Sequence, residues 1–276
     1  MAGQSKAVAA ANTGGALATA FDYGADAGAG FEGTSGADLS IPFISILQSN
    51  SPQVEEDSDK YKPGQLVNTV TGDIIDADAA KQAAGQPFLP VHKETAYVEW
   101  VPRDSGGGFV GLHDPNGEVV KAAIAANGGS RIGKLILPNG NELIETHYIY
   151  GLLLDETGTS TTGFAVVSFT STKIKPYRDF TTAMYTLKGR PPMFANRAIL
   201  RTVRQKNEKG SFYNFKIEPL KGSWMESLIN PQTEAALLEE AKGFRDMVTS
   251  GMARAAFDTQ NSTGDGGNGS SEDPPF

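Results

Sequence analysis

The sequence predicts a mainly β domain, with an antiparallel β core, inserted and C-terminal helices, and disordered ends. Runs rich in β-branched and aromatic residues recur through the middle of the chain, which is typical of strands. An Asn-Gly pair separates two of these runs, and few segments show a helical period. The predicted strands cover 88–101, 133–137, 143–154, 163–170 and 212–217.

A hairpin is predicted around Asn139-Gly140, between the second and third of these strands. Asn-Gly flanked by apolar strands favours a two-residue type I′ turn, because both central residues of that turn need a positive φ. In the last strand, alternation puts Tyr213 and Phe215 on one face and Phe212 and Asn214 on the other.

Two helices are predicted. The first covers 176–187, where Phe180, Met184 and Leu187 recur at helical spacing. The second begins at Asn230-Pro231, because Asn favours the N-cap and Pro the first helical position. Its apolar stripe follows a period of 3.6 through Leu237, Ala241, Phe244 and Val248.

The composition divides the chain into three parts. Residues 1–37 contain 12 Ala and 8 Gly, too little apolar surface to offset the entropy of ordering, and are predicted to be a disordered arm. Residues 257–276 are rich in Gly, Ser, Asn and Asp and are predicted to be a disordered acidic tail. The folded domain is therefore expected over 38–256.

The chain has no cysteine, which excludes disulfides, thiol nucleophiles and cysteine-based metal sites. Residues 12–15 interrupt the N-terminal Ala-rich stretch before the apolar region of a signal peptide could form. No apolar run approaches the roughly 18 residues of a membrane span. We therefore expect a cytoplasmic protein that makes no membrane contact.

The charge is distributed very unevenly. The whole chain carries 24 basic and 32 acidic residues, a net charge of −8. The window 173–221 holds 12 basic residues and three acids and so carries +9, while the remaining residues carry 12 − 29 = −17. Such asymmetry is typical of a chain that binds a polyanion with one face.

Aromatic rings are interleaved with these cations, as a site for single-stranded nucleic acid requires. Cations hold the phosphates, and flat rings stack on bases for about 1–3 kcal/mol each. The alternative is that the rings form core and the cations a solvated face. The candidate DNA-binding residues are Lys173, Lys175, Tyr177, Arg178, Lys188, Arg190, Phe194, Arg197, Arg201, Arg204, Lys206, Lys209, Phe212, Tyr213 and Phe215.

The spacing of these cations suggests an arrangement. Arg197, Arg201 and Arg204 would share one face of a helix, whereas a strand would place Arg204 opposite the other two. Lys173 and Lys175 are expected at the end of a strand, and 206–210 reads as a turn. In an OB-type barrel, strand ends and turns that carry cations converge to form the binding cleft.

Enzymatic alternatives have weaker signals. Residues 128–134 fit G-x-x-x-x-G-K, but Leu135 replaces the Ser/Thr of a P-loop and a strand, not a helix, is expected to follow. His92, His113 and His147 form no metal-binding pair, and a hydrogen-bonded structural role is expected for His147. Asp155 and Glu156, which follow a predicted strand, leave a magnesium-dependent nuclease or recombination enzyme as the alternative. We expect no catalytic residues, metal or cofactor.

The chain ends in Glu272, Asp273, Pro274, Pro275 and Phe276. This end resembles the acidic tip of bacterial single-stranded-DNA-binding proteins, where a glycine-rich linker ends in several Asp and then Ile-Pro-Phe. Pro275 and Phe276 match the last two residues of that tip, whereas Pro274 stands in place of Ile and the run of acids is short. The resemblance implies that these five residues bind replication or recombination proteins.

The body is also similar to phage-encoded proteins of that family, through 38–43, 68–72, 97–103 and 210–213. The similarity implies an OB-fold core that binds single-stranded DNA without sequence preference in phage replication, recombination and repair. It further implies a location in the bacterial host cytoplasm and allows a homo-oligomer. A structural phage protein whose basic face packs against the genome or a partner remains a third hypothesis.

Overall fold

The computed structural model describes residues 30, 32, 40–76, 78–131, 135–208 and 210–257 of the 276-residue chain. Most of the predicted N-terminal arm lies outside these residues, as do 258–276 of the predicted tail. Phe257, which the sequence analysis assigned to the tail, instead packs against the hydrophobic core. The folded part therefore extends one residue further than predicted.

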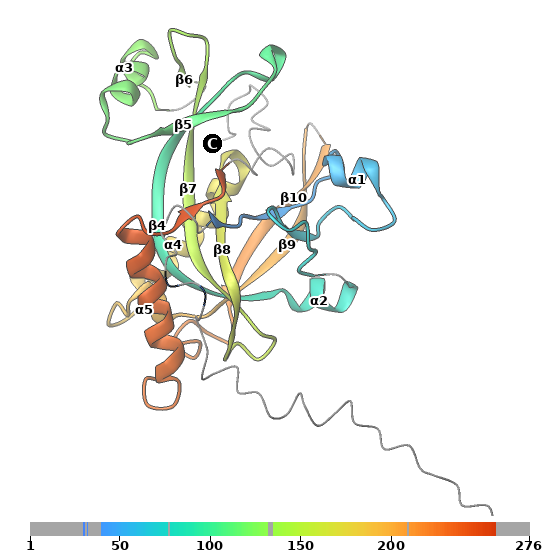
Figure 1. Cartoon of the computed structure of the whole chain (residues 1–276), viewed down its shortest axis with the longest axis vertical. Helices are drawn as coiled ribbons and strands as arrows, with labels where there is room; N and C mark the ends of the chain where they lie inside the picture. The colour runs from blue at the N-terminus through green and yellow to red at the C-terminus, as the bar shows by residue number, and fades with distance from the viewer. Residues whose placement is uncertain are drawn as a thin grey trace, which may run out of the picture.

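A seven-stranded antiparallel sheet forms the centre of the molecule and confirms the mainly β class (Figure 1). The predicted strands in the middle of the chain are all present, with ends shifted by a few residues. The seven strands are β4 (Gln86–Trp100), β5 (Phe109–His113), β6 (Leu135–Ile136), β7 (Glu142–Leu154), β8 (Thr161–Phe169), β9 (Ala198–Asn207) and β10 (Gly210–Pro219).

The two longest strands, β4 and β7, pair with each other over most of their length and organise the sheet. At one end of this pair, β9 joins β4 and β8 joins β7. At the other end, β5 joins β4 and β6 joins β7. The register of β4 against β7 shifts between Pro90 and His92, where proline has no N–H to donate to the ladder, so a bulge there lets the strand bend.

The chain order β4, β7, β8, α4 (Ile174–Thr186), β9, β10 is that of an OB-type barrel. The first of these strands pairs with both the second and the fourth, which curls the sheet. Within the described residues, however, β8 and β10 share no ladder. The predicted barrel is thus present in its strand order, but it is not closed.

An N-terminal segment spans the open side of this curled sheet. It contains β2 (Ile44–Ile46), which pairs with β3 (Leu66–Asn68). Phe43 forms a single bridge with Val166 of β8. At the other edge, the Tyr213 amide donates to Gln48 Oε1 at 2.8 Å and Gln48 Nε2 donates to the Tyr213 carbonyl at 2.9 Å. A side-chain amide therefore occupies the place of a neighbouring strand on the edge of β10.

The sheet buries apolar residues on both faces. On the inner face, Phe88, Ile149 and Phe215 pack against Tyr177 and Phe180 of α4. The outer face is covered by α5 (Ala235–Thr249) and by the short parallel pair of β1 (Ser40–Ile41) and β11 (Arg254–Ala255). Figure 1 shows α5 and β11 on the opposite side of the sheet from α4.

The apolar stripes of the two predicted helices are confirmed, whereas the predicted start of the second helix is not. The first predicted helix is α4, and Leu237, Ala241 and Phe244 of α5 are buried as expected. The predicted start of α5 at Asn230-Pro231 is wrong, because these residues form a turn in which Asn230 Oδ1 accepts from the Gln232 amide. The remaining helices are α1 (Pro52–Glu56), α2 (Ala79–Ala84) and α3 (Glu118–Ala126).

The hairpin predicted around Asn139-Gly140 joins β6 and β7, but the turn is not type I′. Gly140 has φ +87°, whereas Asn139 is not among the residues with positive φ. The Gly140 amide donates to the Leu137 carbonyl, and the Leu137 amide donates to the Asn141 carbonyl. The loop is therefore longer than two residues and uses glycine alone in the left-handed region.

Two further expectations are settled by the fold. Lys173 and Lys175 do not end a strand, because β8 stops at Phe169 and a short 3-10 turn leads directly into α4. Of the P-loop-like sequence, Gly133 and Lys134 lie outside the described residues, and strand β6 follows at Leu135 where a P-loop requires a helix. In the part of the chain that the structure describes, no helix is long and apolar enough to cross a membrane.

Candidate nucleic-acid interface

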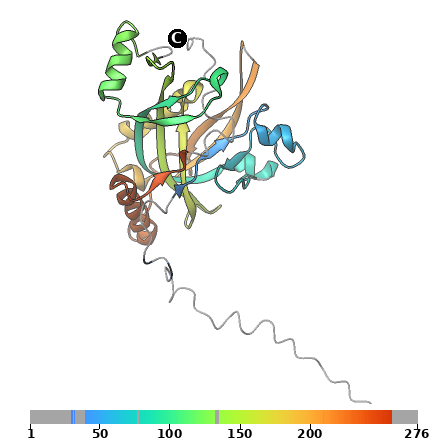
Figure 2. The same cartoon turned by 45° about the horizontal axis from the view of Figure 1, so that its top comes forward.

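The hairpin of β9 and β10 forms an arm that extends beyond the body of the sheet (Figure 2). β9 pairs with β4 only through Ala198–Leu200. Residues 201–207 therefore continue beyond the first residue of β4, and their partner strand is β10. Arg204 and Lys206 lie on this outer part, and both are exposed. Within the described residues, neither forms an ion pair. Both charged side chains therefore lie on the surface of the arm.

Aromatic residues lie on both faces of the same arm. Tyr213 is directly opposite Arg204 and half-buried, and Phe212 is opposite Gln205 on the other face. The Tyr213 ring lies against the backbone of Gly64, where an added Cβ would approach within 2.6 Å of the ring. Glycine at that position lets the loop before β3 pack closely under the arm.

This loop adds two cations that the sequence analysis missed. The Thr202 hydroxyl donates to the Gly64 carbonyl at 2.6 Å, which ties the loop to β9. Lys60 and Lys62 lie in the loop and are exposed. They stand more than 100 residues before the basic window, so neither local composition nor spacing could associate them with Arg204. Among the described residues, the four exposed cations of this region are Lys60, Lys62, Arg204 and Lys206, hereafter the arm cations.

A second set of exposed cations lies on α4 and the turn after it. Arg178 and Lys188 are exposed, and the Arg190 guanidinium lies 4.7 Å from the centre of the Tyr185 ring. Among the residues that the structure describes, no interaction joins this set to the arm cations. The basic window is thus divided between two places in the fold.

Four of the predicted site residues are largely interior. Tyr177 and Phe215 belong to the inner core, and Phe194 packs against the outer one. Lys173 is 8% exposed, and its Nζ lies 5.6 Å from the centre of the Phe215 ring. Burial lowers the Lys173 pKa to about 7. These four residues lie in the interior and do not belong to the candidate DNA-binding surface.

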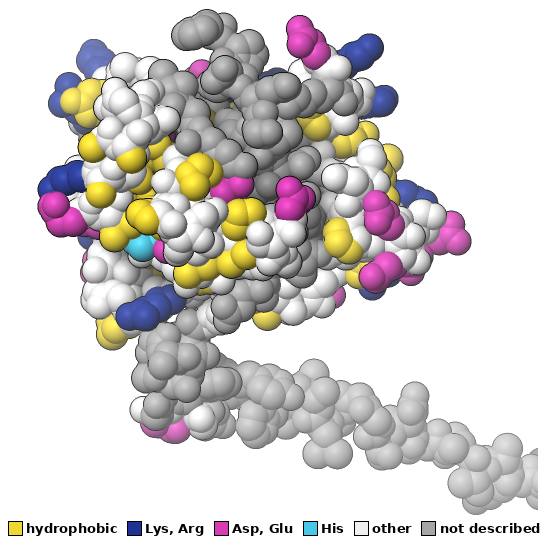
Figure 3. All heavy atoms as spheres, turned by 90° about the horizontal axis from the view of Figure 1, so that it is seen from above, with side chains coloured by type: hydrophobic (Ala, Val, Ile, Leu, Met, Phe, Trp, Pro, Cys, Tyr) yellow, Lys and Arg dark blue, Asp and Glu magenta, His cyan; other side chains and the backbone are white. Residues whose placement is uncertain are grey.

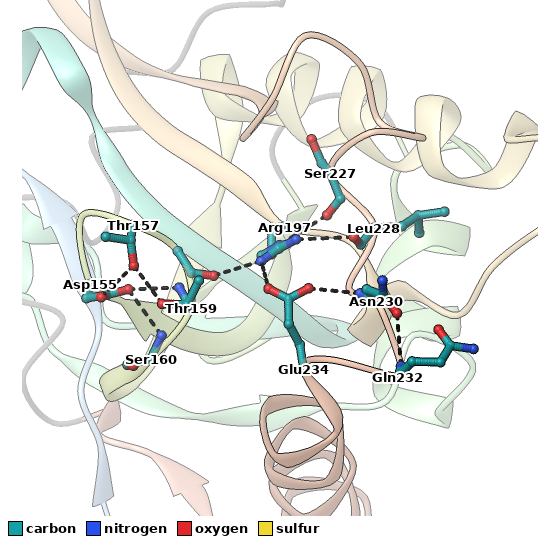
Figure 4. A network of polar contacts seen from close by, with 11 residues as sticks. Asp155, Thr157, Thr159, Ser160, Arg197, Ser227, Leu228, Asn230, Gln232 and Glu234 are labelled. Atoms are coloured by element: carbon teal, nitrogen blue, oxygen red, sulfur yellow. Dashed lines mark hydrogen bonds and ion pairs between the residues drawn. The ribbon is translucent and has the colours of Figure 1, made fainter.

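Arg197 is also interior, in a network that Figure 4 shows. It is 2% exposed, and its Nη1 donates to Glu234 Oε1 at 2.6 Å and to the Gly158 carbonyl at 3.1 Å. The same guanidinium donates to the carbonyls of Ser227 and Leu228. Arg197 therefore holds together three loops and is not part of a surface for phosphate.

Three more cations of the window are paired with its own acids. Lys175 Nζ is 2.7 Å from Asp179 Oδ2. Arg201 and Lys216 both pair with Glu218, at 3.3 and 2.8 Å. Of the other candidates, Lys209 lies outside the described residues, as do all five tail residues, Glu272 to Phe276. The structure thus brings together Arg204, Lys206, Phe212 and Tyr213 from the predicted set.

A cluster of aromatic rings lies on the outer face of the sheet, outside the basic window. The Phe109 and Phe257 rings are stacked, with centroids 5.5 Å apart and an interplanar angle of 8°. Trp100 adjoins Phe109, and Phe43 and Tyr148 adjoin Phe257. In the sequence, only the aromatic residues of the predicted strand 88–101 indicated such a cluster, because the other rings of the cluster come from distant parts of the chain.

Figure 3 looks down on the end of the molecule that lies uppermost in Figure 1, where β5 and α3 are found. Hydrophobic side chains gather across the middle of this face, with acidic side chains among them. Lysine and arginine side chains lie toward its margins. The electrostatic character of this face is therefore mixed.

The groups that suggested catalysis have structural roles. His147 Nδ1 is 2.8 Å from Thr95 Oγ1, and its ring stacks on Tyr177 with centroids 4.2 Å apart. Burial, with Arg178 and Lys93 nearby, lowers the His147 pKa to about 4. Asp155 accepts hydrogen bonds from Thr157 and from the amides of Thr159 and Ser160, which closes the β7–β8 turn (Figure 4) and lowers its pKa.

A second polar cluster ties the β4–β7 connection to the sheet. Glu99 Oε2 is 2.7 Å from His113 Nε2, and Glu99 Oε1 accepts from Asn141 at 2.6 Å and Asn139 at 3.2 Å. These hydrogen bonds, the one from Asn141 above all, lower the Glu99 pKa. Within the described ranges, no three His, Asp or Glu side chains are placed to hold a metal ion.

Comparison with known proteins places the chain in a phage-related family. Neither a curated protein nor a solved structure gives a significant match. The sequence profile of the Pam3 phage gp34-like protein family matches residues 11–254, which is most of the chain. The chain therefore belongs to the Pam3 phage gp34-like protein family.

Proposed function

We propose that this protein binds single-stranded DNA without sequence preference in phage DNA replication, recombination and repair. The observation that carries the proposal is the arm of β9 and β10 on an OB-type strand order. Arg204 and Lys206 are exposed there, and Lys60 and Lys62 stand on the loop packed beneath. Exposed cations and aromatic rings on the same element suit the phosphates and bases of a single strand.

The C-terminal tail supplies the second part of the proposal. Its acids Glu272 and Asp273 compete with DNA for the cations and are displaced when a strand binds. The terminal Phe276, which carries a ring and a carboxylate together, docks into an apolar pocket with a basic rim on a replication or recombination partner.

A titration with oligo(dT) at several salt concentrations tests the binding. If the four arm cations neutralise four phosphates, the slope of log K against log salt is near −3, at about 0.7 per phosphate of a single strand. The measurement is fluorescence anisotropy of a labelled oligonucleotide with the full chain. An affinity that does not change with salt, or no binding at low salt, would contradict the proposal.

A further inference from the structure

A cavity of about 420 Å³ opens on the outer face of the sheet, beside the aromatic cluster. Strands β4, β5 and β7 form one side of it, and the segment that follows α5 forms the other. Its volume lies in the range of about 300–1,000 Å³ that is usual for small-molecule sites. None of its lining residues belongs to the basic window.

The walls of this cavity combine aromatic and aliphatic side chains with polar groups. Phe109 and Phe257, the stacked pair, both line it, and Leu112 and Val248 add aliphatic surface. Leu112 lies on β5 and is 40% exposed, although it is apolar. A planar ring entering the cavity would cover these side chains and stack on an aromatic one.

Two charged residues give the cavity a chemical preference. Glu94 lines it, and Glu94 Oε2 accepts a hydrogen bond from the Tyr150 hydroxyl at 3.2 Å. Burial raises the Tyr150 pKa, so the phenol stays a donor and helps to orient the carboxylate. A carboxylate has further acceptor sites beyond this bond and can receive an amino group. Arg254, also a lining residue, is exposed and can meet a phosphate.

We propose that this cavity receives one unpaired base of the bound strand, and that Glu94 accepts a hydrogen bond from the exocyclic amino group of that base. The inference rests on the proposed single-strand binding and adds a preference to it. Carboxylates accept from the cytosine N4 amino group, whereas thymine presents an O4 acceptor in its place and is repelled. Other bases of the strand contact only the arm, so every sequence still binds.

The test compares oligo(dC) with oligo(dT) of equal length, since the two bases have the same ring size. We expect the full chain to bind oligo(dC) at least about tenfold more tightly, as for one hydrogen bond to a charged group. In Glu94→Gln this ratio falls to near one, because an amide can accept from cytosine and also donate to thymine. The matched control is Glu239→Gln, which removes the same charge from an exposed ion pair with Lys242 on α5 and keeps the ratio.

Leu112→Arg provides a second variant at an exposed position of the cavity wall, chosen because the fold tolerates polar side chains there. It fills the cavity and is expected to abolish the preference for oligo(dC) while oligo(dT) still binds.

The outcomes separate the two proposals. Binding of both oligonucleotides with equal affinity, unchanged in Glu94→Gln, would overturn the base pocket and leave the proposed function intact. Binding of neither would overturn the proposed function itself. A preference for oligo(dC) that persists in both Glu94→Gln and Leu112→Arg would show that another site reads the base.

Discussion

At the scale of single residues, the environment decides what each cation of the basic window does. Arg197 directly precedes strand β9 and Arg204 lies within it, seven residues later, yet the first is 2% exposed and the second is on the surface. A buried guanidinium needs a partner for each donor, whereas an exposed one keeps its charge for a ligand. The two residues are therefore expected to respond to substitution in different assays.

Replacing Arg204 and Lys206 together with Ala should weaken DNA binding equally for all sequences. Each cation that contacts a phosphate contributes about 0.7 to the salt slope, so the slope should fall in magnitude by about 1.4. Anisotropy titrations at several salt concentrations measure this change. The control removes two exposed cations elsewhere, Lys121→Ala with Lys242→Ala, and an equal effect of that pair would show that only net charge matters.

Replacing Arg197 with Met should destabilise the fold by about 3–5 kcal/mol, because it leaves Glu234 and several carbonyls without their donor. Urea unfolding followed by circular dichroism measures the free energy of unfolding. Arg201→Met is the comparison, since its ion pair with Glu218 is about one-third exposed and should contribute less than about 1 kcal/mol. Equal losses in the two variants would contradict the role given to the Arg197 network.

At the scale of elements, α4 packs on the inner face of the curled sheet and contacts a buried histidine. His147 of β7 stacks on Tyr177 of α4, and Phe180 packs among the inner core residues. The apolar spacing of the helix was visible in the sequence, and so was a hydrogen-bonded role for His147. Their contact was not, because it joins residues 30 apart whose meeting depends on how the sheet curls.

The contact between β7 and α4 should make stability depend on pH. The His147 pKa is about 4 in the folded protein and 6.5 ordinarily, so the unfolded chain takes up the proton first. The stability that the neutral ring contributes is complete above pH 6.5 and is lost as the pH falls through 4. Relative to His147→Phe, which keeps the stacking and cannot titrate, the wild type should lose about 2–3 kcal/mol over this window.

Unfolding free energies of the two proteins at pH 7, 6, 5 and 4 test this dependence. The lost hydrogen bond to Thr95 lowers the stability of the variant by a similar amount at every pH, so only the change with pH is diagnostic. Parallel curves for the two proteins would contradict the buried, neutral histidine.

At the scale of the whole molecule, the arm cations and the acidic end of the chain are far apart in the sequence. The arm cations belong to the fold, whereas four acids and no base follow Phe257. The net charge of −8 by itself would argue against DNA binding. If the tail competes with DNA, however, part of this negative charge regulates the binding.

Deleting 258–276 should therefore tighten binding to oligo(dT) and abolish binding to tail-dependent partners. The matched control keeps the tail but neutralises its acids through Asp258→Asn, Asp265→Asn, Glu272→Gln and Asp273→Asn. We expect it to tighten DNA binding as the deletion does, because the competition is electrostatic. Anisotropy titration measures both variants, and an unchanged affinity after deletion would refute the competition.

The sequence by itself determined the β class, most strand positions, the apolar stripes of α4 and α5, and the uneven charge. These properties are local, since they follow from side-chain periodicity and composition along a continuous segment. The start of α5 was missed because two hydrogen bonds keep Asn230-Pro231 in a turn: the Gln232 amide donates to Asn230 Oδ1, and the Asn230 amide donates to Glu234 Oε2.

Only the tertiary structure decided which charges and rings are available to a ligand. It buried Arg197 and Lys173, placed Lys60 and Lys62 beneath the arm, and collected rings from Phe43 to Phe257 on one face. Burial and proximity depend on contacts between distant segments, and a charge or ring has the same appearance in the sequence whether it lies inside or outside. The physical reason is that desolvation and pairing are properties of the folded surroundings and not of the residue.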